Sequence, residues 1–233
     1  MTIKATYYLT PNAAGTAFQG TGYTPDGTIP AGAIPCTQAQ AQNWQAYVPS
    51  NGEIVSAPDS VLLQQAQSAQ IALVTKGYNA ATDYVPVTIN GTTYQADNTA
   101  GKQALNLSLA ITANAMMQSP AWAASTEYAT GSYCSVGGVI LFCSMAGKSG
   151  TSAPTPPTTF GTPVADGTAA WELLGRKVYL QGGSFVYMTP QQIMSAFQQG
   201  ELYLHQMSDQ LELLKVEINA ATTISAVQDY TFP

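Results

Sequence analysis

The sequence predicts an α+β fold: a small mixed N-terminal β region, helices with β-hairpins, an inserted small all-β module, and a long C-terminal helix. Three observations lead to this prediction. An Asn90-Gly91 pair between two alternating β-branched runs specifies a tight hairpin. Helical periodicity stops over residues 119–176, where Gly, Pro, Thr, Ser and aromatic residues take over. After Thr189, apolar residues recur every three or four positions, as in a long amphipathic helix.

These changes divide the 233-residue chain into three regions. Residues 1–57 form an N-terminal β-rich region. Residues 58–118 and 177–233 form a discontinuous α+β domain of hairpins and helices, and residues 119–176 form the inserted β module. A chain of this length can hold two or three small domains, so the division is physically reasonable.

The N-terminal region is predicted to consist of strands and turns. Residues 4–10 favour a first strand, and the Pro-Asp-Gly sequence at 25–27 indicates a turn. Thr37 is placed to cap a short helix that runs through Tyr47, because the Ala and Gln residues between them are good helix formers. Residues 52–55 then return as a strand.

Two helices flank the Asn90-Gly91 hairpin. Residues 61–76 predict a helix that Gly77 ends. A second helix runs from about Ala100 to Met117, with Asp97 or Thr99 as its cap.

A Gly137-Gly138 turn organises the inserted module. The hairpin that it predicts pairs Val136 with Val139, Cys134 with Leu141, and Tyr133 with Phe142. In this register Cys143 is only a diagonal neighbour of Cys134, with Cα atoms about 7–8 Å apart, which is too far for easy disulfide formation. We therefore expect both cysteines to be free core residues of a protein made in a reducing compartment.

The last helix follows a hairpin around residues 182–183 and carries a narrow apolar seam. Thr189 is its N-cap, Pro190 its first residue and Gln192 its capping-box residue. The seam has a strict 3-4-3-4 spacing and consists of Leu204, Met207, Leu211, Leu214 and Ile218. Such a seam packs against one partner helix, which either the same chain or another copy could supply. We expect a homo-oligomer, with a trimer favoured.

Charged residues are scarce. They make up 9% of the chain, against about a quarter in ordinary soluble domains, and the net charge is −6. The seven Lys and Arg residues form no stripe, so we expect no binding to nucleic acid, which needs clustered cations. No apolar run is long enough to span a membrane, so no membrane insertion is expected. The first ten residues lack the basic-then-apolar order of a signal peptide.

Few residues could support catalysis. His205 is the only histidine and has no nucleophile near it in the sequence, and no ligand cluster predicts a metal or cofactor. One catalytic alternative is open: glycoside hydrolysis needs only two carboxylates, and Glu127, Asp166 and Glu172 lie in the module. A module this small rarely forms a cleft deep enough to tune an acid by burial. We expect no enzyme and no catalytic residues.

The module resembles a small repeat that is common in phage tail fibres and other virion appendages. The repeat has a Trp, a Tyr-x-x-Gly motif, an aromatic-Cys pair, a Gly-Thr-Ser-Pro-rich loop and a closing Asp-Gly-Thr-x-x-Trp. It is also similar to carbohydrate-binding modules of the chitin-binding type. The resemblance rests on the following residues: Trp122, Tyr128, Gly131, Phe142, Cys143, Gly147, Pro154, Asp166, Gly167, Thr168 and Trp171.

The flanking segments, residues 89–105 and 183–228, resemble the two halves of a domain of unknown function that is frequent in tailed-phage tail proteins. That domain often follows an N-terminus like those of tail-fibre assembly proteins, and residues 29–44 are loosely of this kind. In the family, the hairpin and the helices form one unit. The module is therefore expected to be an insertion after Met117.

The resemblance to carbohydrate-binding modules implies glycan contacts through aromatic side chains. Aromatic faces stack on the apolar C–H faces of pyranose rings, which makes Trp122, Tyr128, Tyr133 and Trp171 the candidates. The competing interpretation, which we favour, is that these residues form the core of a module with little else to bury. Tyr133, opposite Phe142, is the candidate expected to be most exposed.

The two resemblances together imply a structural component of a bacteriophage tail or baseplate that contributes to host-receptor or glycan attachment. Its expected partners are other tail or baseplate proteins, further copies of itself and a host surface glycan. Its expected location is the virion, after synthesis in the host cytoplasm. A tail-fibre assembly chaperone acting in the host cytosol is the alternative, and a glycan-cleaving enzyme is a minor one.

Overall fold

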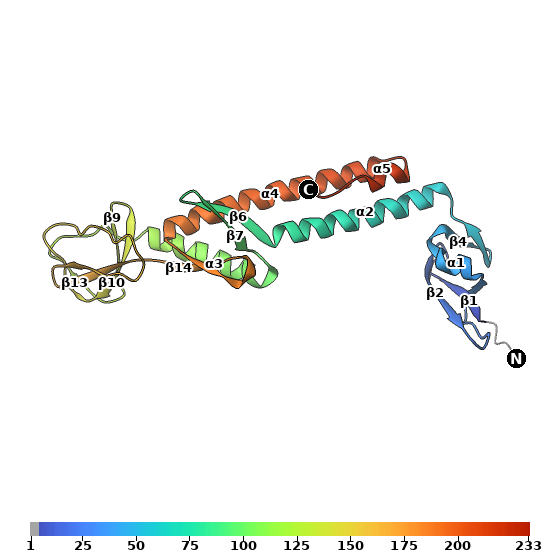
Figure 1. Ribbon diagram of the computed structural model, residues 1–233, viewed down its shortest axis with the longest axis horizontal. Helices are drawn as coiled ribbons and strands as arrows, with labels where there is room; N and C mark the ends of the chain where they lie inside the picture. Colours follow the sequence, from blue (N-terminus) through green and yellow to red (C-terminus); the bar gives the residue numbers. More distant parts are fainter. Residues whose placement is uncertain (1–4) are drawn as a thin grey trace. The chain divides into compact units, whose positions relative to one another are not determined.

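The protein has an α+β fold, seen in a computed structural model that describes residues 5–233 (Figure 1). The chain forms two compact units. The first holds the chain up to Val74 together with Leu214–Thr231, and the second holds Thr75–Leu213 with Phe232–Pro233. Two of the three division points fall inside long helices, whereas the predicted boundaries lie after residues 57, 118 and 176. The three-region division stays a prediction.

The first unit contains a three-stranded antiparallel sheet in the order β2-β1-β3. Its strands are β1 (Thr6–Pro11), β2 (Phe18–Thr24) and β3 (Ile34–Cys36). Leu9 is fully buried and Phe18 nearly so, which makes them the centre of this small sheet. The first predicted strand is confirmed from Thr6 onward, and Lys4 lies outside the described residues.

The helix that begins after Thr37 is shorter than predicted. Helix α1 spans Gln38–Gln42, and its capping box is complete. The Gln40 backbone N–H donates to Thr37 Oγ1 at 3.2 Å, while the Thr37 N–H donates to Gln40 Oε1 at 2.9 Å.

Tyr47, the predicted end of that helix, lies in a strand instead. A 3-10 turn at Trp44–Ala46 leads into β4 (Tyr47–Ser50), which pairs with β5 (Glu53–Ser56). Pro49 has no backbone N–H to donate within a helix, and it disfavours helix at the residue before it. The predicted helix therefore stops early because the Pro49 segment pairs as a hairpin.

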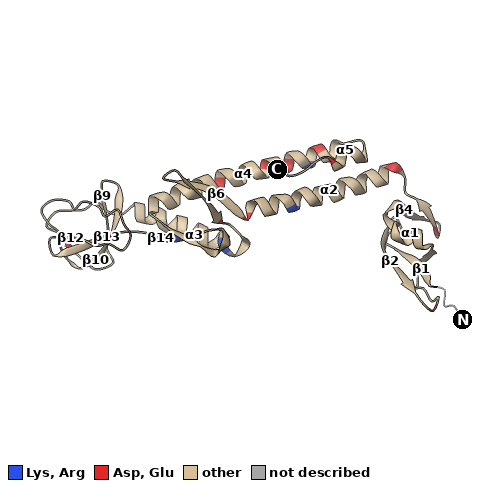
Figure 2. Ribbon diagram, in the orientation of Figure 1, with Lys and Arg blue, Asp and Glu red and all other residues tan. Residues whose placement is uncertain are grey.

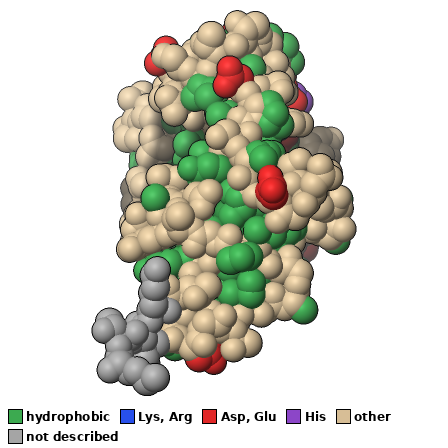
Figure 3. Space-filling view, turned by 90° about the vertical axis from the view of Figure 1, so that its right-hand side faces the viewer, with side chains coloured by type: hydrophobic (Ala, Val, Ile, Leu, Met, Phe, Trp, Pro, Cys, Tyr) green, Lys and Arg blue, Asp and Glu red, His purple; other side chains and the backbone are tan. Residues whose placement is uncertain are grey.

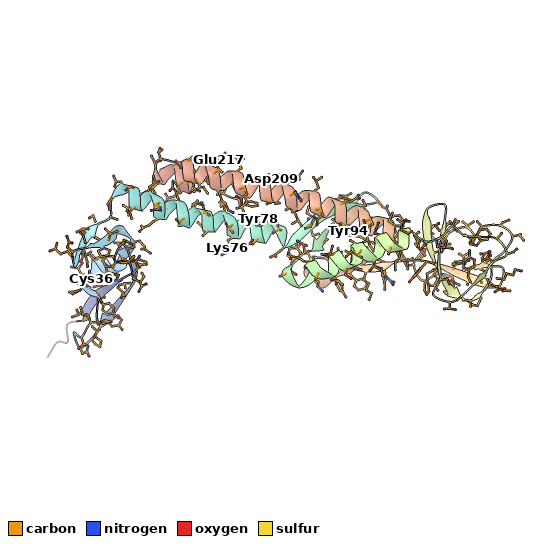
Figure 4. The ribbon with its side chains drawn as sticks, turned by 180° about the vertical axis from the view of Figure 1, so that it is seen from behind. Cys36, Lys76, Tyr78, Tyr94, Asp209 and Glu217 are labelled. Atoms are coloured by element: carbon orange, nitrogen blue, oxygen red, sulfur yellow. The ribbon has the colours of Figure 1, made fainter. Side chains whose placement is uncertain are left out.

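Helix α2 (Asp59–Thr82) continues past Gly77, so the predicted stop at Gly77 is wrong. A Cβ atom placed at Gly77 would lie only 2.7 Å from the Cβ of Phe232. The Phe232 ring also meets Tyr78 edge-on, at 5.9 Å between ring centroids (Figure 4). Gly77 is therefore a site of close packing for the C-terminal segment and does not end the helix.

Helix α4 (Pro190–Ala220) begins as predicted. The Thr189 N–H donates to Gln192 Oε1 at 2.9 Å, and the Gln192 N–H donates to Thr189 Oγ1 at 3.3 Å. This capping box satisfies two N–H groups at the start of the helix. No helix within the described residues combines the length and the apolar character needed to cross a membrane.

In the first unit, α2 packs beside the end of α4 and the short helix α5 (Ile224–Gln228), which the sequence analysis did not predict. The Gln67 side-chain amide donates to the carbonyl oxygens of Asn219 and Ala221, each at 3.1 Å. The apolar side chains buried in this region are Val74, Ile218 and Val227.

The second unit combines α4 with helix α3 (Ala100–Met117) and two hairpins. Strands β6 (Tyr84–Ile89) and β7 (Thr92–Asp97) form the first hairpin. Its turn residues Asn90 and Gly91 have φ angles of 50° and 78°, so the predicted tight turn is confirmed.

The second hairpin pairs β14 (Arg176–Tyr179) with β15 (Phe185–Met188), as the Gly-Gly pair at 182–183 predicts. Both hairpins, α3 and α4 share one hydrophobic core, against which Tyr94 of β7 also packs (Figure 4). The buried residues of this core are Val85, Val87, Ile89, Ala113, Val178, Met188 and Ile193.

The inserted module is a four-stranded antiparallel sheet in the order β12-β13-β10-β9, with a small pair beside it. Its strands are β8 (Glu127–Tyr128), β9 (Tyr133–Val136), β10 (Val139–Met145), β11 (Gly147–Lys148), β12 (Val164–Asp166) and β13 (Ala169–Leu173). All three predicted pairings across the Gly137-Gly138 turn are confirmed. Cys134 and Cys143 are buried and free, also as predicted.

Candidate functional site

Two of the four aromatic candidates, Trp122 and Trp171, meet at Asp166, and a third, Tyr128, packs against Trp171. The indole N–H groups of Trp122 and Trp171 donate to Asp166 Oδ2 at 2.7 and 2.9 Å. The Gly150 backbone N–H donates to the other carboxylate oxygen at 2.7 Å. Asp166 is only 6% exposed, and three charge-assisted hydrogen bonds offset the cost of burying its carboxylate.

This arrangement gives the Trp, Tyr and Asp residues of the carbohydrate-binding-like motif a structural role in the core of the module. Trp171 is 0% exposed, which agrees with the favoured interpretation that its ring belongs to the core. The ring of Tyr128 packs edge-on against Trp171, at 4.8 Å between centroids, and its hydroxyl accepts the Ala123 N–H at 2.8 Å. Trp122 and Tyr128 are half-buried around the same core.

The fourth candidate, Tyr133, lies apart from that core. It is half-buried on the opposite face of the sheet and pairs with Phe142 across β9 and β10, as predicted. Their ring centroids are 5.9 Å apart, and the planes are tilted by 47°. Tyr133 is therefore the one candidate whose ring borders open space away from the Asp166 cluster.

The three module carboxylates lie in different surroundings. The Asp166 carboxylate accepts from the two indoles on the core face, whereas Glu172 follows Trp171 on β13 and points to the other face. Glu127 is exposed on the edge strand β8. The glycan-cleaving alternative stays a prediction.

The predicted seam of α4 faces its own chain. Leu211 is 6% exposed and Ile218 is fully buried, while Leu204, Met207 and Leu214 are half-buried. In the second unit, Leu204 packs against the hydrophobic core. This burial agrees with the alternative in which the seam packs within its own chain. A contact between copies would then use another apolar surface.

An apolar stripe on α3 provides such a surface. Leu107 is 51% exposed and Ile111 is 62% exposed, and the exposed residues Ala104 and Ala115 extend the stripe at helical spacing. This stripe is not among the features predicted from the sequence. Its spacing was visible, but the sequence could not show which apolar face of residues 100–117 the other elements would cover.

Beside the stripe, an apolar groove of about 390 Å³ lies between α3 and α4. Its lining includes Val85, Val87 and Val178, which belong to the hydrophobic core, and its sides include Leu107 and Leu204. Of the described residues that line it, Glu201 alone is charged. The core residues on its floor are buried: Val85, Val87 and Val178 are 4%, 2% and 8% exposed.

Charged side chains are sparse along the described chain. Figure 2 shows the Lys, Arg, Asp and Glu residues widely spaced along the ribbon. A space-filling view of one end shows hydrophobic side chains between neutral polar atoms, with few charged groups (Figure 3). Contacts with other molecules must therefore rely on apolar burial and neutral hydrogen bonds more than on ion pairs.

His and Cys side chains are also present among the described residues. Within the described residues, no three His, Cys, Asp or Glu side chains are grouped to hold a metal ion. His205 is exposed, and its Nδ1 lies 3.1 Å from the carbonyl oxygen of Glu201, one turn earlier. Burial raises the pKa of the Cys36 thiol, and that of Cys143 in the module.

Comparison of the chain with protein-family models, with curated proteins and with solved structures finds no match.

Proposed function

We propose that this chain is a structural subunit of a tailed-bacteriophage tail or baseplate and that it assembles as a homo-oligomer, with a trimer favoured. The observation that carries the proposal is the exposed α3 stripe beside a groove open to the hydrophobic core. Low charge, the sequence resemblances and the separation of the module carboxylates support the same function.

The energetics favour covering this surface with apolar side chains. Full burial of a Leu or Ile side chain contributes about 1.5–3 kcal/mol. Leu107 and Ile111 are each about half exposed or more, so together they would contribute about 2–3 kcal/mol per copy. A second copy of the chain suits the groove, because the same subunit carries both the groove and an apolar stripe able to enter it.

The first test is the mass of the purified protein in solution, measured by light scattering over a dilution series. The wild-type chain is expected to give an oligomer, and a Leu107→Gln, Ile111→Gln double variant is expected to give monomers. Gln is a good helix former, so α3 should persist. Met145→Gln, which alters a 53% exposed residue of the module, is the matched control and should leave the mass unchanged. A wild-type monomer at every concentration would refute the assembly.

The second test concerns the particle. Mass spectrometry of purified virions is expected to find the chain as a stoichiometric component. Its absence from mature particles, combined with co-purification with unassembled fibres, would refute the structural role and favour the assembly-chaperone alternative.

A further inference from the structure

A second hollow, of about 350 Å³, lies on the face of the module sheet opposite the Asp166 cluster. It is bordered by the sheet and by the hairpin β14–β15, both in the second unit. We call it the aromatic hollow. Four aromatic and two charged side chains define it: Tyr133, Phe142, Phe160, Tyr187, Glu172 and Arg176.

Strand register places a carboxylate beside two rings in this hollow. Tyr133 pairs with Phe142 across β9 and β10, and Phe142 pairs with Glu172 across β10 and β13. Directly paired side chains lie on one face of a sheet, with Cβ atoms about 4.5–5.5 Å apart. The row therefore presents two aromatic rings and a hydrogen-bond acceptor in a line.

The opposite side of the hollow is held by backbone contacts. Phe160 forms an isolated parallel bridge with Leu173, and a Cβ atom at Gly175 would overlap the Phe160 ring. The absence of a side chain at Gly175 thus lets the ring lie directly against the backbone. The Phe160 ring in turn packs on Tyr187, with centroids 5.6 Å apart and planes tilted by 37°.

The side chain of Tyr187 remains available to a ligand. It is 43% exposed, and Phe185 supports it edge-on at 5.7 Å between centroids. The ammonium group of Lys177 lies 4.3 Å from the Phe185 centroid and 5.8 Å from the Tyr187 centroid, so it makes cation–π contacts with both rings.

The lining restricts the chemistry of the occupant. A purely apolar ligand would desolvate Glu172 and Arg176 without offering them partners, at a cost of several kcal/mol on the order expected for buried charges. A phosphate group would be attracted by Arg176 but repelled by the Glu172 carboxylate, so the two charges of the lining offset each other. A neutral sugar ring suits both the aromatic and the charged parts of the lining. Its C–H face packs on aromatic rings, while its hydroxyls donate to Glu172 and accept from Arg176.

We propose that the aromatic hollow binds a pyranose ring of a neutral oligosaccharide, stacked on Tyr187 and hydrogen-bonded to Glu172 and Arg176. This inference deepens the proposed function, on which it rests, by giving the tail subunit a site for a surface glycan. It also moves the site away from Trp122, Tyr128 and Trp171. Of the four aromatic residues predicted from the sequence, Tyr133 alone contributes to it.

The test applies the full-length chain to an array of neutral and acidic oligosaccharides, followed by titration of the strongest binder. The wild-type protein is expected to bind neutral oligosaccharides. Tyr187→Ala and Glu172→Ala should each weaken binding by roughly tenfold, which corresponds to about 1.4 kcal/mol, because each removes a direct contact with the sugar. Tyr187→Phe keeps the ring and should retain binding. Tyr23→Ala, at a 67% exposed residue of the first unit, should leave binding unchanged.

Three outcomes would overturn the proposal. The wild-type chain binds no saccharide, it binds acidic saccharides alone, or the Tyr187→Ala and Glu172→Ala variants bind as tightly as the wild type. Unfolding midpoints of all variants show whether a loss reflects the site or the fold. Mass measurements on the same samples separate the two proposals. If the wild-type chain is an oligomer that binds no sugar, only the proposal of sugar binding is refuted. If it is a monomer that binds sugar, only the proposal of assembly is refuted.

Discussion

Trp122 and Trp171 donate their indole N–H groups to the same oxygen of Asp166, at 2.7 and 2.9 Å, although 49 positions of sequence separate the two tryptophans. This shared acceptor closes the module, because it joins the segment before its first strand to its last strand. The residues that resemble a carbohydrate-binding motif are therefore needed for folding, whatever the module binds.

The first prediction concerns this acceptor. Asp166→Asn would put an amide N–H group toward an indole N–H and remove the charge that strengthens all three hydrogen bonds. We expect the free energy of unfolding to fall by about 2–4 kcal/mol, which urea denaturation followed by tryptophan fluorescence would measure. Glu127→Gln, at an exposed edge position, should change it by less than about 0.5 kcal/mol. Equal stability of the two variants would contradict this role for Asp166.

Gly77 and Phe232 provide the second prediction. In an ordinary helix interior, Gly→Ala stabilises by about 0.8–1 kcal/mol. Here the new Cβ atom would lie 2.7 Å from Phe232 Cβ, so the C-terminal segment must move. We expect Gly77→Ala to be neutral or destabilising in the wild-type chain and stabilising in a Phe232→Gly background, which removes the Cβ atom that the new side chain would meet. A double-mutant cycle from thermal unfolding measures the coupling, and strict additivity would show that the contact is unimportant.

The buried thiols give a pH dependence. Burial raises the pKa of Cys134 from its ordinary value of 9.0 to about 12, with a smaller contribution from the nearby Asp166 carboxylate. The folded chain keeps this proton at pH values where the unfolded chain loses it. The resulting stability is fully present below about pH 9 and is lost as the pH rises to about 12.

We therefore expect the unfolding midpoint in urea to decline between pH 9 and pH 12, and Cys134→Ala to make this decline shallower. The rate of thiol labelling at pH 8 gives an independent measure of how deeply each cysteine is buried. Cys36, which is half-buried at the end of β3, should react before the two module cysteines (Figure 4). Rapid labelling of Cys134 in the folded protein would be inconsistent with its burial.

Local sequence signals predicted the features that depend on neighbouring residues. The Asn90-Gly91 and Gly137-Gly138 turns fixed their hairpin registers, because a two-residue turn leaves only one pairing for the strands it joins. The capping box at Thr189 likewise located the start of α4. In these cases the interactions that decide the structure lie within a few residues of each other.

Features set by distant contacts were missed. Gly77 has the sequence appearance of a helix stop, and only its packing against Phe232, 155 positions later, explains why the helix continues. The same holds for the candidate site. The aromatic hollow combines Tyr133 of the module with Tyr187 of a separate hairpin, a proximity that no local pattern indicates.

The last prediction concerns Gly167 in the Asp-Gly-Thr part of the module motif. Gly167 and Gly138 both have positive φ angles, 66° and 83°, so Ala at either position costs about 1–2 kcal/mol in backbone strain. The two glycines differ in their surroundings.

A Cβ atom at Gly138 meets open space, whereas one at Gly167 would overlap the Lys148 carbonyl oxygen, which accepts the Thr168 N–H at 2.9 Å. Because that neighbour is backbone in a hydrogen bond, it cannot move away cheaply. We expect Gly167→Ala to lower the free energy of unfolding by at least about 1–3 kcal/mol more than Gly138→Ala does, measured by urea denaturation. Similar losses in the two variants would mean that φ alone requires glycine at Gly167, and that the close approach of the two backbones has no measurable role.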